Sequence, residues 1–229
     1  MKKDLIVVIG AYGSGKSEYS VNLSRQYNAA SKGVMLVDLD VVNPYFRTRD
    51  VREKFEKTGI EVVAPHGENK YADIPMLSPG ISAAISKYDK TVILDVGGDP
   101  AGCRTLARYI PDIKKRGYQM HFVVNTKRPF TSDKVGIFNM IDMLEETSKL
   151  KITELICNTN LMEFTDEEVI TSGIKIIEEA ANERNIKFEK YLVLEDYDDI
   201  ISENILCKTK VTMNYFLNKP WEKPLMKGL

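Results

Sequence analysis

The chain has 229 residues, of which 43% are hydrophobic and 28% charged, and its formal net charge is -1. This length supports one well-buried core and is short for two full domains, so we expect a single domain over residues 1–229. A net charge near zero argues against a general nucleic-acid binder, which needs a basic surplus. No apolar run approaches the roughly 18 residues of a membrane span.

The chain has three cysteines, Cys103, Cys157 and Cys207, which lie far apart and form no C-x-x-C pair. An odd, scattered set is typical of a reducing compartment rather than of a disulfide framework or a zinc site. The cysteines therefore favour a cytoplasmic location.

Short apolar runs rich in β-branched residues recur along the chain. They cover residues 5–9, 34–39, 61–65, 91–96, 121–125, 152–158 and 191–194. Such runs predict strands that are buried on both faces, as in a parallel sheet. Because stretches with helical signals lie between most of them, we predict an α/β fold with a doubly wound, mainly parallel sheet and helices on both faces.

Two stretches carry clear helical signals. Residues 165–168 (TDEE) form a capping box, which predicts a helix that starts there. Earlier in the chain, Thr131 and Ser132 precede an apolar stripe at helical spacing. Its members are Val135, Phe138, Ile141 and Leu144. We interpret this stripe as core packing.

A glycine-rich turn follows the first predicted strand. Residues 10–17 (GAYGSGKS) fit the pattern G-x-x-x-x-G-K-[ST], in which backbone N–H groups and a helix N-terminus surround phosphate. In this arrangement Lys16 reaches the β- and γ-phosphates, and the Ser17 hydroxyl binds Mg²⁺. The predicted nucleotide-binding residues of this phosphate loop are Gly10, Gly13, Ser14, Gly15, Lys16 and Ser17. The loop predicts a nucleoside triphosphate site.

Carboxylates follow two further predicted strands. Asp38 and Asp40 follow the second strand, and the fourth ends at Asp95, ahead of residues 97–99 (GGD). In a doubly wound sheet these strand ends lie beside the phosphate loop. An apolar strand that ends in Asp is suited to Mg²⁺ coordination, and paired glycines can approach a γ-phosphate. For Asp99, capping of the following helix is the alternative interpretation.

These segments resemble those of the nitrogenase iron protein, MinD and ParA group of P-loop ATPases, the SIMIBI class, which includes CobQ/CobB-type domains. Residues 36–50 (LVDLDVVNPYFRTRD) resemble switch I of that group, and residues 95–102 (DVGGDPAG) resemble switch II. The resemblance implies a domain that binds ATP with Mg²⁺ and hydrolyses it. The implied catalytic residues are Lys16, Asp38, Asp40 and Asp99, and the implied Mg²⁺ ligands are Ser17, Asp40 and Asp95. It also implies that Gly98 contacts the γ-phosphate and that Asp99 orients the attacking water.

The resemblance also implies which residues lie on the base. Residues 154–161 (ELICNTNL) resemble the strand whose Asn reads adenine, which assigns Asn158 to the base. Residues 192–199 (LVLEDYDD) resemble the next base-side loop and add Asp196. The GTP signatures N-K-x-D and T-K-x-D are absent. ATP is therefore the expected nucleotide.

The phosphate loop departs from the dimerising members of that group. Those members carry a second lysine, in G-K-G-G-x-G-K-[ST], at the position of Ala11, and Tyr12 replaces a glycine. A homodimer that uses a lysine across its interface is therefore not indicated. Cys103 lies one residue past the position of a cluster cysteine of the iron protein, and we interpret it as a small buried hydrophobe.

Three functions are compatible with these residues. The leading interpretation is a nucleotide-dependent ATPase switch that acts on an unidentified protein partner. The alternative is an ATP-dependent biosynthetic enzyme, like dethiobiotin synthetase or cobyrinate amidase, that phosphorylates a small carboxylate substrate. The complete set of carboxylates argues against a module that only holds ATP. Residues 66–80 are rich in loop signals and either hold a second substrate or cover the sheet edge.

Overall fold

The computed structural model describes residues 4–30, 33–40, 55–63, 79–86 and 88–216, with the side chains of residues 79, 80 and 101 left aside. Residues 41–50 of the segment that resembles switch I, and residues 66–78 of the long loop, lie outside the described residues.

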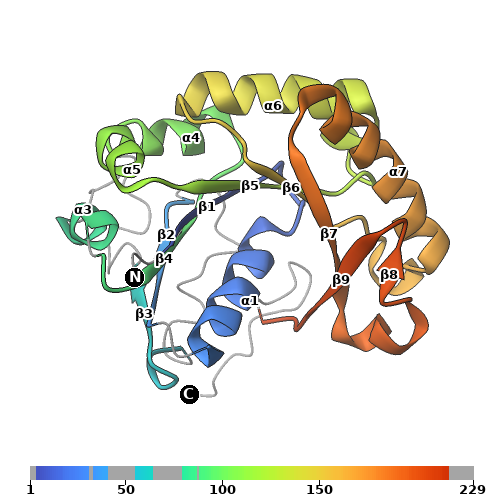
Figure 1. Ribbon diagram of the computed structural model, residues 1–229, viewed down its shortest axis with the longest axis horizontal. Helices are drawn as coiled ribbons and strands as arrows, with labels where there is room; N and C mark the ends of the chain where they lie inside the picture. Colours follow the sequence, from blue (N-terminus) through green and yellow to red (C-terminus); the bar gives the residue numbers. More distant parts are fainter. Residues whose placement is uncertain (1–3, 31–32, 41–54, 64–78, 87, 217–229) are drawn as a thin grey trace, which may run out of the picture.

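Nine strands form one sheet in the part of the chain that the structure describes (Figure 1). Their bounds are β1 Leu5–Ile9, β2 Val34–Asp38, β3 Ile60–Val63, β4 Thr91–Asp95, β5 Gln119–Val124, β6 Glu154–Cys157, β7 Lys187–Leu194, β8 Asn204–Ile205 and β9 Lys208–Met213. Their order is β3-β2-β4-β1-β5-β6-β7-β9-β8, and every pair is parallel except β8 with β9. The predicted α/β class is confirmed.

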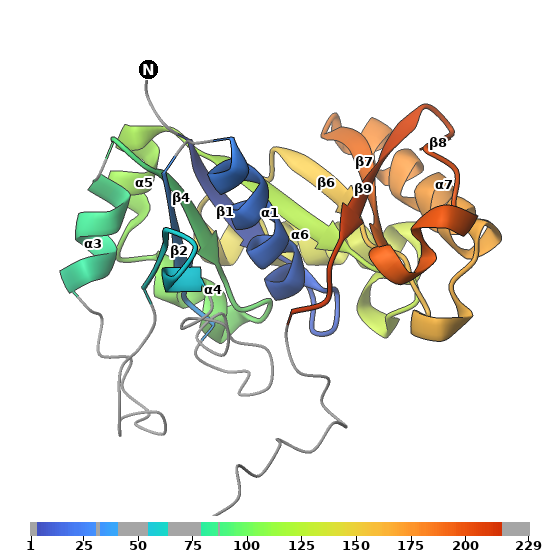
Figure 2. The same ribbon diagram turned by 90° about the horizontal axis from the view of Figure 1, so that it is seen from below.

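Helices cover both faces of this sheet. Their bounds are α1 Lys16–Ala29, α3 Pro79–Ser86, α4 Pro100–Leu106, α5 Ile110–Arg116, α6 Lys134–Ser148 and α7 Glu167–Arg184, with short 3-10 turns η3 Pro129–Thr131, η4 Met162–Phe164 and η5 Glu195–Ile200. Figures 1 and 2 show α1 on one side of the sheet and α4, α5 and α6 on the other. Successive side chains of a strand point to opposite faces of the sheet, so β1 contributes to the core on both faces. Val7 packs in the cluster under α3 to α7, whereas Ile6 and Val8 pack with Tyr19 of α1 on the other face.

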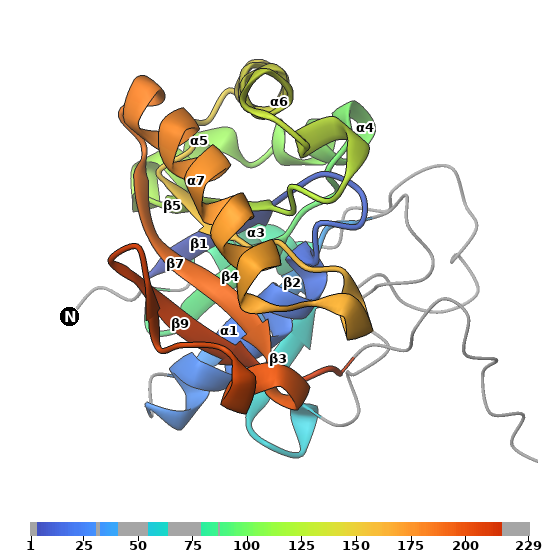
Figure 3. The same ribbon diagram turned by 90° about the vertical axis from the view of Figure 1, so that its right-hand side faces the viewer.

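All seven predicted strands exist, with ends shifted by a few residues. The sequence missed β8 and β9, which extend the sheet past β7 (Figure 3). Strand β9 (KTKVTM) begins with three polar residues and has only one fully buried residue, Met213, so it contains no apolar run. An apolar run marks a strand that is buried on both faces. Strand β9, which lies between β7 and the two-residue edge strand β8, is not buried in this way.

Both predicted helices exist, but their first residues differ from the prediction. Helix α7 is capped by Asp166, whose carboxylate accepts from the Val169 N–H at 2.7 Å, so the cap lies one residue after Thr165. Helix α6 is capped by Asp133 rather than by Thr131 or Ser132. In the apolar stripe, Ile141 and Leu144 are buried and Phe138 packs against the core, but Val135 is 63% exposed, so the prediction for Val135 was wrong.

Candidate functional site

The predicted phosphate loop joins β1 to α1 at the carboxyl edge of the sheet. Gly13 and Gly15 have φ of 73° and 85°, a left-handed conformation that favours glycine. Gly15 is the N-cap of α1 and offers no side chain to the first N–H groups of the helix. These N–H groups, together with the positive end of the helix dipole, are suited to bind an anion.

Three carboxylates converge beside this loop. Asp38 and Asp95 are register partners at the ends of the neighbouring strands β2 and β4, and both are buried. Asp38 accepts the backbone N–H of Asp40 at 3.0 Å. Nζ of Lys16 lies 2.8 Å from Oδ2 of Asp40. The structure thus brings these four predicted residues together, and it shows a direct contact between Asp40 and Lys16 that the sequence analysis did not foresee.

The charges of this cluster are strongly coupled. Burial alone would lower the pKa of Lys16, but the carboxylates of Asp95, Asp40 and Asp38 outweigh it and raise the pKa above its ordinary value. Burial raises the pKa of Asp95 to about 6, against the attraction of Lys16 and with the repulsion of Asp40. The raised pKa of the loop lysine keeps it positively charged, whereas the pKa of Asp95, at about 6, lies well above that of an ordinary aspartate.

Ser17 and Asp95 are suited to hold Mg²⁺. Ser17 Oγ and Asp95 Oδ2 are buried, and neither has a well-formed hydrogen bond to a described residue, although the Ser17 hydroxyl lies near enough to Asp95 to lower the pKa of that carboxyl. Buried oxygens of this kind are costly to leave without a partner, and hydroxyl and carboxylate oxygens are the ligands that Mg²⁺ prefers. The described residues hold no group of three or more His, Cys, Asp and Glu side chains that could bind a metal. Mg²⁺ beside phosphates keeps several waters and needs only one or two protein ligands.

The paired glycines after β4 pack directly against the phosphate loop. A Cβ atom on Gly98 would lie 1.6 Å from the carbonyl oxygen of Gly10, so only glycine fits at that position. Asp99 is the N-cap of α4, and its Oδ1 accepts the Gly102 N–H at 2.7 Å. The capping interpretation of Asp99 is thus confirmed, and a role toward water stays a prediction. Cys103 is fully buried, as predicted, and burial raises the pKa of its thiol to about 12.

The two residues assigned to the base lie in different places. Asn158 lines the pocket next to the phosphate loop, and its Nδ2 donates to the carbonyl oxygen of Ser14 at 2.7 Å. The amide therefore braces the loop, and a Cβ on Gly15 would collide with it. Asp196 lies in η5, is exposed and does not line the pocket, whereas Leu194 two residues earlier does.

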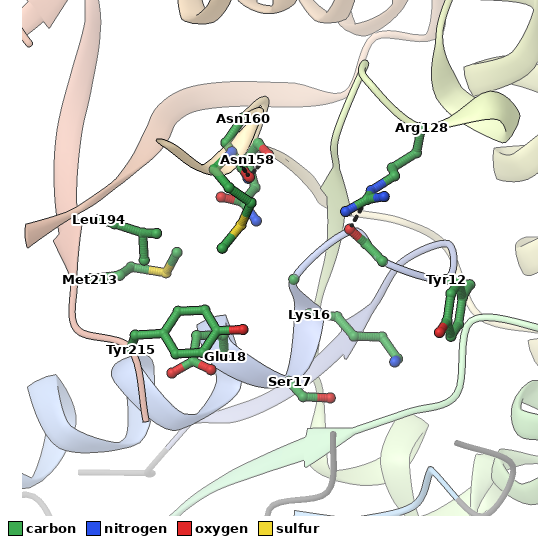
Figure 4. A pocket seen from close by; sticks show the side chains of 13 residues that line it. Tyr12, Lys16, Ser17, Glu18, Arg128, Asn158, Asn160, Leu194, Met213 and Tyr215 are labelled. Atoms are coloured by element: carbon green, nitrogen blue, oxygen red, sulfur yellow. Dashed lines mark hydrogen bonds between the residues drawn. The ribbon is translucent and has the colours of Figure 1, made fainter. Parts of the chain in front are cut away.

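A pocket of about 300 Å³ opens beside the start of α1 (Figure 4). Its lining residues are Tyr12, Gly13, Gly15, Lys16, Ser17, Glu18, Arg128, Asn158, Asn160, Met162, Leu194, Met213 and Tyr215. The sequence predicted the phosphate-loop residues and Asn158 but none of the apolar ones. A pocket of this size, with polar groups at one end and apolar groups at the other, suits a nucleotide.

Arg128 is the most informative residue that sequence reasoning missed. Its Nε donates to the carbonyl oxygen of Gly13 at 3.2 Å, so the guanidinium lies on the phosphate loop (Figure 4). Arg128 follows β5 by four residues, at the same edge of the sheet as the carboxylates. This position shortly after a predicted strand is the sequence signal that could have identified Arg128 as a site residue.

Similar solved structures share the fold. Cell division protein FtsY from Thermotoga maritima has a TM-score of 0.54 at 16% identity, over 83% of this chain and 62% of that one. Signal recognition particle receptor FtsY from Elizabethkingia anophelis, in complex with GDP, has a TM-score of 0.54 at 16% identity, over 84% and 58%. The signal recognition particle 54 kDa protein from Aeropyrum pernix K1, in complex with GDP, has the same TM-score and identity, over 82% and 41%.

The similarity to these structures is limited in coverage and in sequence identity. The chain spans about three fifths of the length of these two FtsY structures. At such low identity the likeness shows the α/β fold of P-loop nucleotide-binding domains and nothing finer. No protein-family model matches the chain, and no curated protein sequence matches it either. Among the described residues, no helix is both long and apolar enough to cross a membrane.

Proposed function

We propose that this protein binds ATP with Mg²⁺, hydrolyses it, and acts as a nucleotide-dependent switch on a protein partner. One observation carries the proposal: a buried lysine in a glycine-rich loop lies against Asp40, with Asp95 and Ser17 beside it. This set joins a binding site for the phosphates to oxygens suited to the metal.

Each residue has a place in this proposal. Lys16 and the N–H groups at the start of α1 bind the β- and γ-phosphates. Ser17 and Asp95 hold Mg²⁺, which, when bound, neutralises the negative charge on the phosphates. Asp38 and Asp40, which lie close to Lys16, are the residues we assign to orienting water.

Two contacts support a switch. Asp40, which begins the segment after β2, binds the lysine that phosphate would bind. Gly98, in the segment after β4, packs on the carbonyl oxygen of Gly10. A γ-phosphate between these segments would change both contacts, and such segments are what partners read in switch proteins of this kind. The resemblance to the nitrogenase iron protein, MinD and ParA group supports the same role.

Calorimetric titration tests the choice of nucleotide and the site together. We expect ATP with Mg²⁺ to bind more tightly than GTP with Mg²⁺ and to release phosphate on incubation. Lys16→Ala serves as the matched control for both measurements. Equal or tighter binding of GTP would contradict the adenine preference, and ATP binding that survives in Lys16→Ala would contradict the site. A pull-down with ATP compared with ADP then identifies a partner that binds one state only.

A further inference from the structure

The segment that follows β9 is fixed to one face of α1. Glu18, Asn22 and Arg25 lie four and three residues apart and so share a stripe of that helix. Asn22 Nδ2 donates to the carbonyl oxygen of Asn214 at 2.9 Å, and the Asn214 N–H donates to Asn22 Oδ1 at 2.9 Å. One amide side chain thus pairs with both backbone groups of a residue that is distant in the sequence.

Three further contacts join this segment to the helix on both sides of Asn22. Arg25 Nη1 donates to Asn214 Oδ1 at 3.0 Å, and its guanidinium lies 4.5 Å from the centroid of the Phe216 ring. At the other end, the Phe216 N–H donates to Glu18 Oε1. Asn22 is buried, so its bonds are shielded from water and costly to break.

The same segment also forms a wall of the pocket. Met213 and Tyr215 line the pocket, and the residues that alternate with them, Asn214 and Phe216, bond to α1; Met213 is in addition buried in the core cluster that contains Tyr19 of α1. In Figure 4, Met213 and Tyr215 lie with Leu194 at one end of the pocket, away from the Nζ atom of Lys16. The pocket therefore has an apolar end and a phosphate-binding end.

We propose that Met213 and Tyr215 form the binding surface for the nucleobase, and that Asn22 is a positioning residue that sets affinity for the base without setting affinity for the phosphates. The inference rests on the proposed function and deepens it. A purine ring stacks favourably on an aromatic side chain and on a thioether. Because α1 begins at the phosphate loop, the Asn22–Asn214 pairing fixes the span between the two ends of the pocket.

Two ligands separate the two ends of the pocket: ATP, and inorganic tripolyphosphate, which has no base. Both are titrated with Mg²⁺ into the full chain and into Asn22→Ala and Tyr215→Ala. Asn28→Ala is the matched control, because the Asn28 side chain lies on the same helix and bonds to Thr58 instead. We expect both test variants to raise the Kd of ATP about tenfold or more and to change that of tripolyphosphate less than about twofold. Asn28→Ala should change neither.

The outcomes discriminate between the two proposals. An equal loss for ATP and tripolyphosphate, or an unchanged ATP affinity in Tyr215→Ala, overturns the inference and leaves the phosphate site intact. If Asn22→Ala loses its cooperative melting transition, it is no longer folded, and the affinities of Tyr215→Ala for ATP and tripolyphosphate alone test the inference. A parent protein that binds both ligands equally tightly also overturns the inference. A parent protein that binds neither ligand overturns the proposed function itself.

Discussion

The Nζ atom of Lys16 lies 2.8 Å from Oδ2 of Asp40, and both side chains are buried. Asp38 and Asp95 add to the same electrostatic field and keep the lysine charged. A phosphate that enters the loop therefore meets a lysine already paired with a carboxylate, and it has to compete with Asp40 for that lysine.

This competition predicts opposite effects for the two partners. Lys16→Ala removes a charge-assisted contact of about 1.5–3 kcal/mol and should weaken ATP binding by about ten- to a hundredfold. Asp40→Asn removes the competitor and should leave the Kd of ATP unchanged or lower, as measured by calorimetry with Mg²⁺. If Asp40→Asn weakens ATP binding as much as Lys16→Ala does, Asp40 itself holds the metal, as the resemblance to the ATPase group implied.

Asp95 should make stability depend on pH. Its pKa is raised to about 6 in the fold, chiefly by burial, from about 3.9 in the unfolded chain. The native state thus favours the protonated carboxyl, so stability from this group is fully present below about pH 4 and is lost as the pH rises through about 6. Relative to Asp95→Asn, the parent should lose roughly 2 kcal/mol of unfolding free energy between pH 4 and pH 7.

Urea unfolding of the parent and of Asp95→Asn across this pH range measures the difference. Asp196→Asn is the matched control, because Asp196 is exposed and lies outside the pocket. Parallel curves for the parent and Asp95→Asn would show that Asp95 ionises as freely in the fold as in the unfolded chain.

The sequence predicted the parts of the site that are local in the chain. An apolar strand, a glycine loop and a helix follow one another within residues 5–29, and Asp95 ends an apolar run, so both could be placed by pattern. The wall formed by Met213 and Tyr215 could not, because β7 and β9 bring it to α1 through pairing across the sheet. The resemblance to the ATPase group assigned Asn158 to the base but did not reveal that its amide binds the Ser14 carbonyl.

Arg128 should contribute to phosphate binding rather than to base binding. Its guanidinium lies on the Gly13 carbonyl and lines the pocket. We expect Arg128→Ala to weaken ATP and tripolyphosphate alike, by about tenfold. Arg128→Lys should recover only part of the affinity, because an ammonium lacks the planar fork that can bond the loop and a phosphate together.

Lys127→Ala is the control for Arg128, because the neighbouring Lys127 bonds to Ser172 rather than to the loop. It should leave both affinities unchanged. If Arg128→Ala binds ATP and tripolyphosphate as tightly as the parent does, Arg128 only supports the loop and does not bind phosphate.

Asp99 has two candidate roles, and the cap of α4 allows them to be separated. Its Oδ1 accepts the Gly102 N–H at 2.7 Å, and Asn caps helices about as well as Asp does. Asp99→Asn should therefore keep the cap and remove the charge, whereas Asp99→Ala removes both and should cost about 1 kcal/mol of stability. If the carboxylate orients the attacking water, both variants should bind ATP within a few-fold of the parent.

Their turnover per folded molecule should fall by roughly 10²–10⁴, the range for a lost general base. Phosphoryl transfer depends mainly on positioning and electrostatics, so a loss of turnover with intact binding is the signature of such a group. Single-turnover phosphate release, normalised to the folded fraction from the melting curve, measures it. If Asp99→Asn turns over like the parent while Asp99→Ala only melts earlier, Asp99 is a helix cap alone. The water-orienting role then passes to Asp38 or Asp40, which lie beside Lys16.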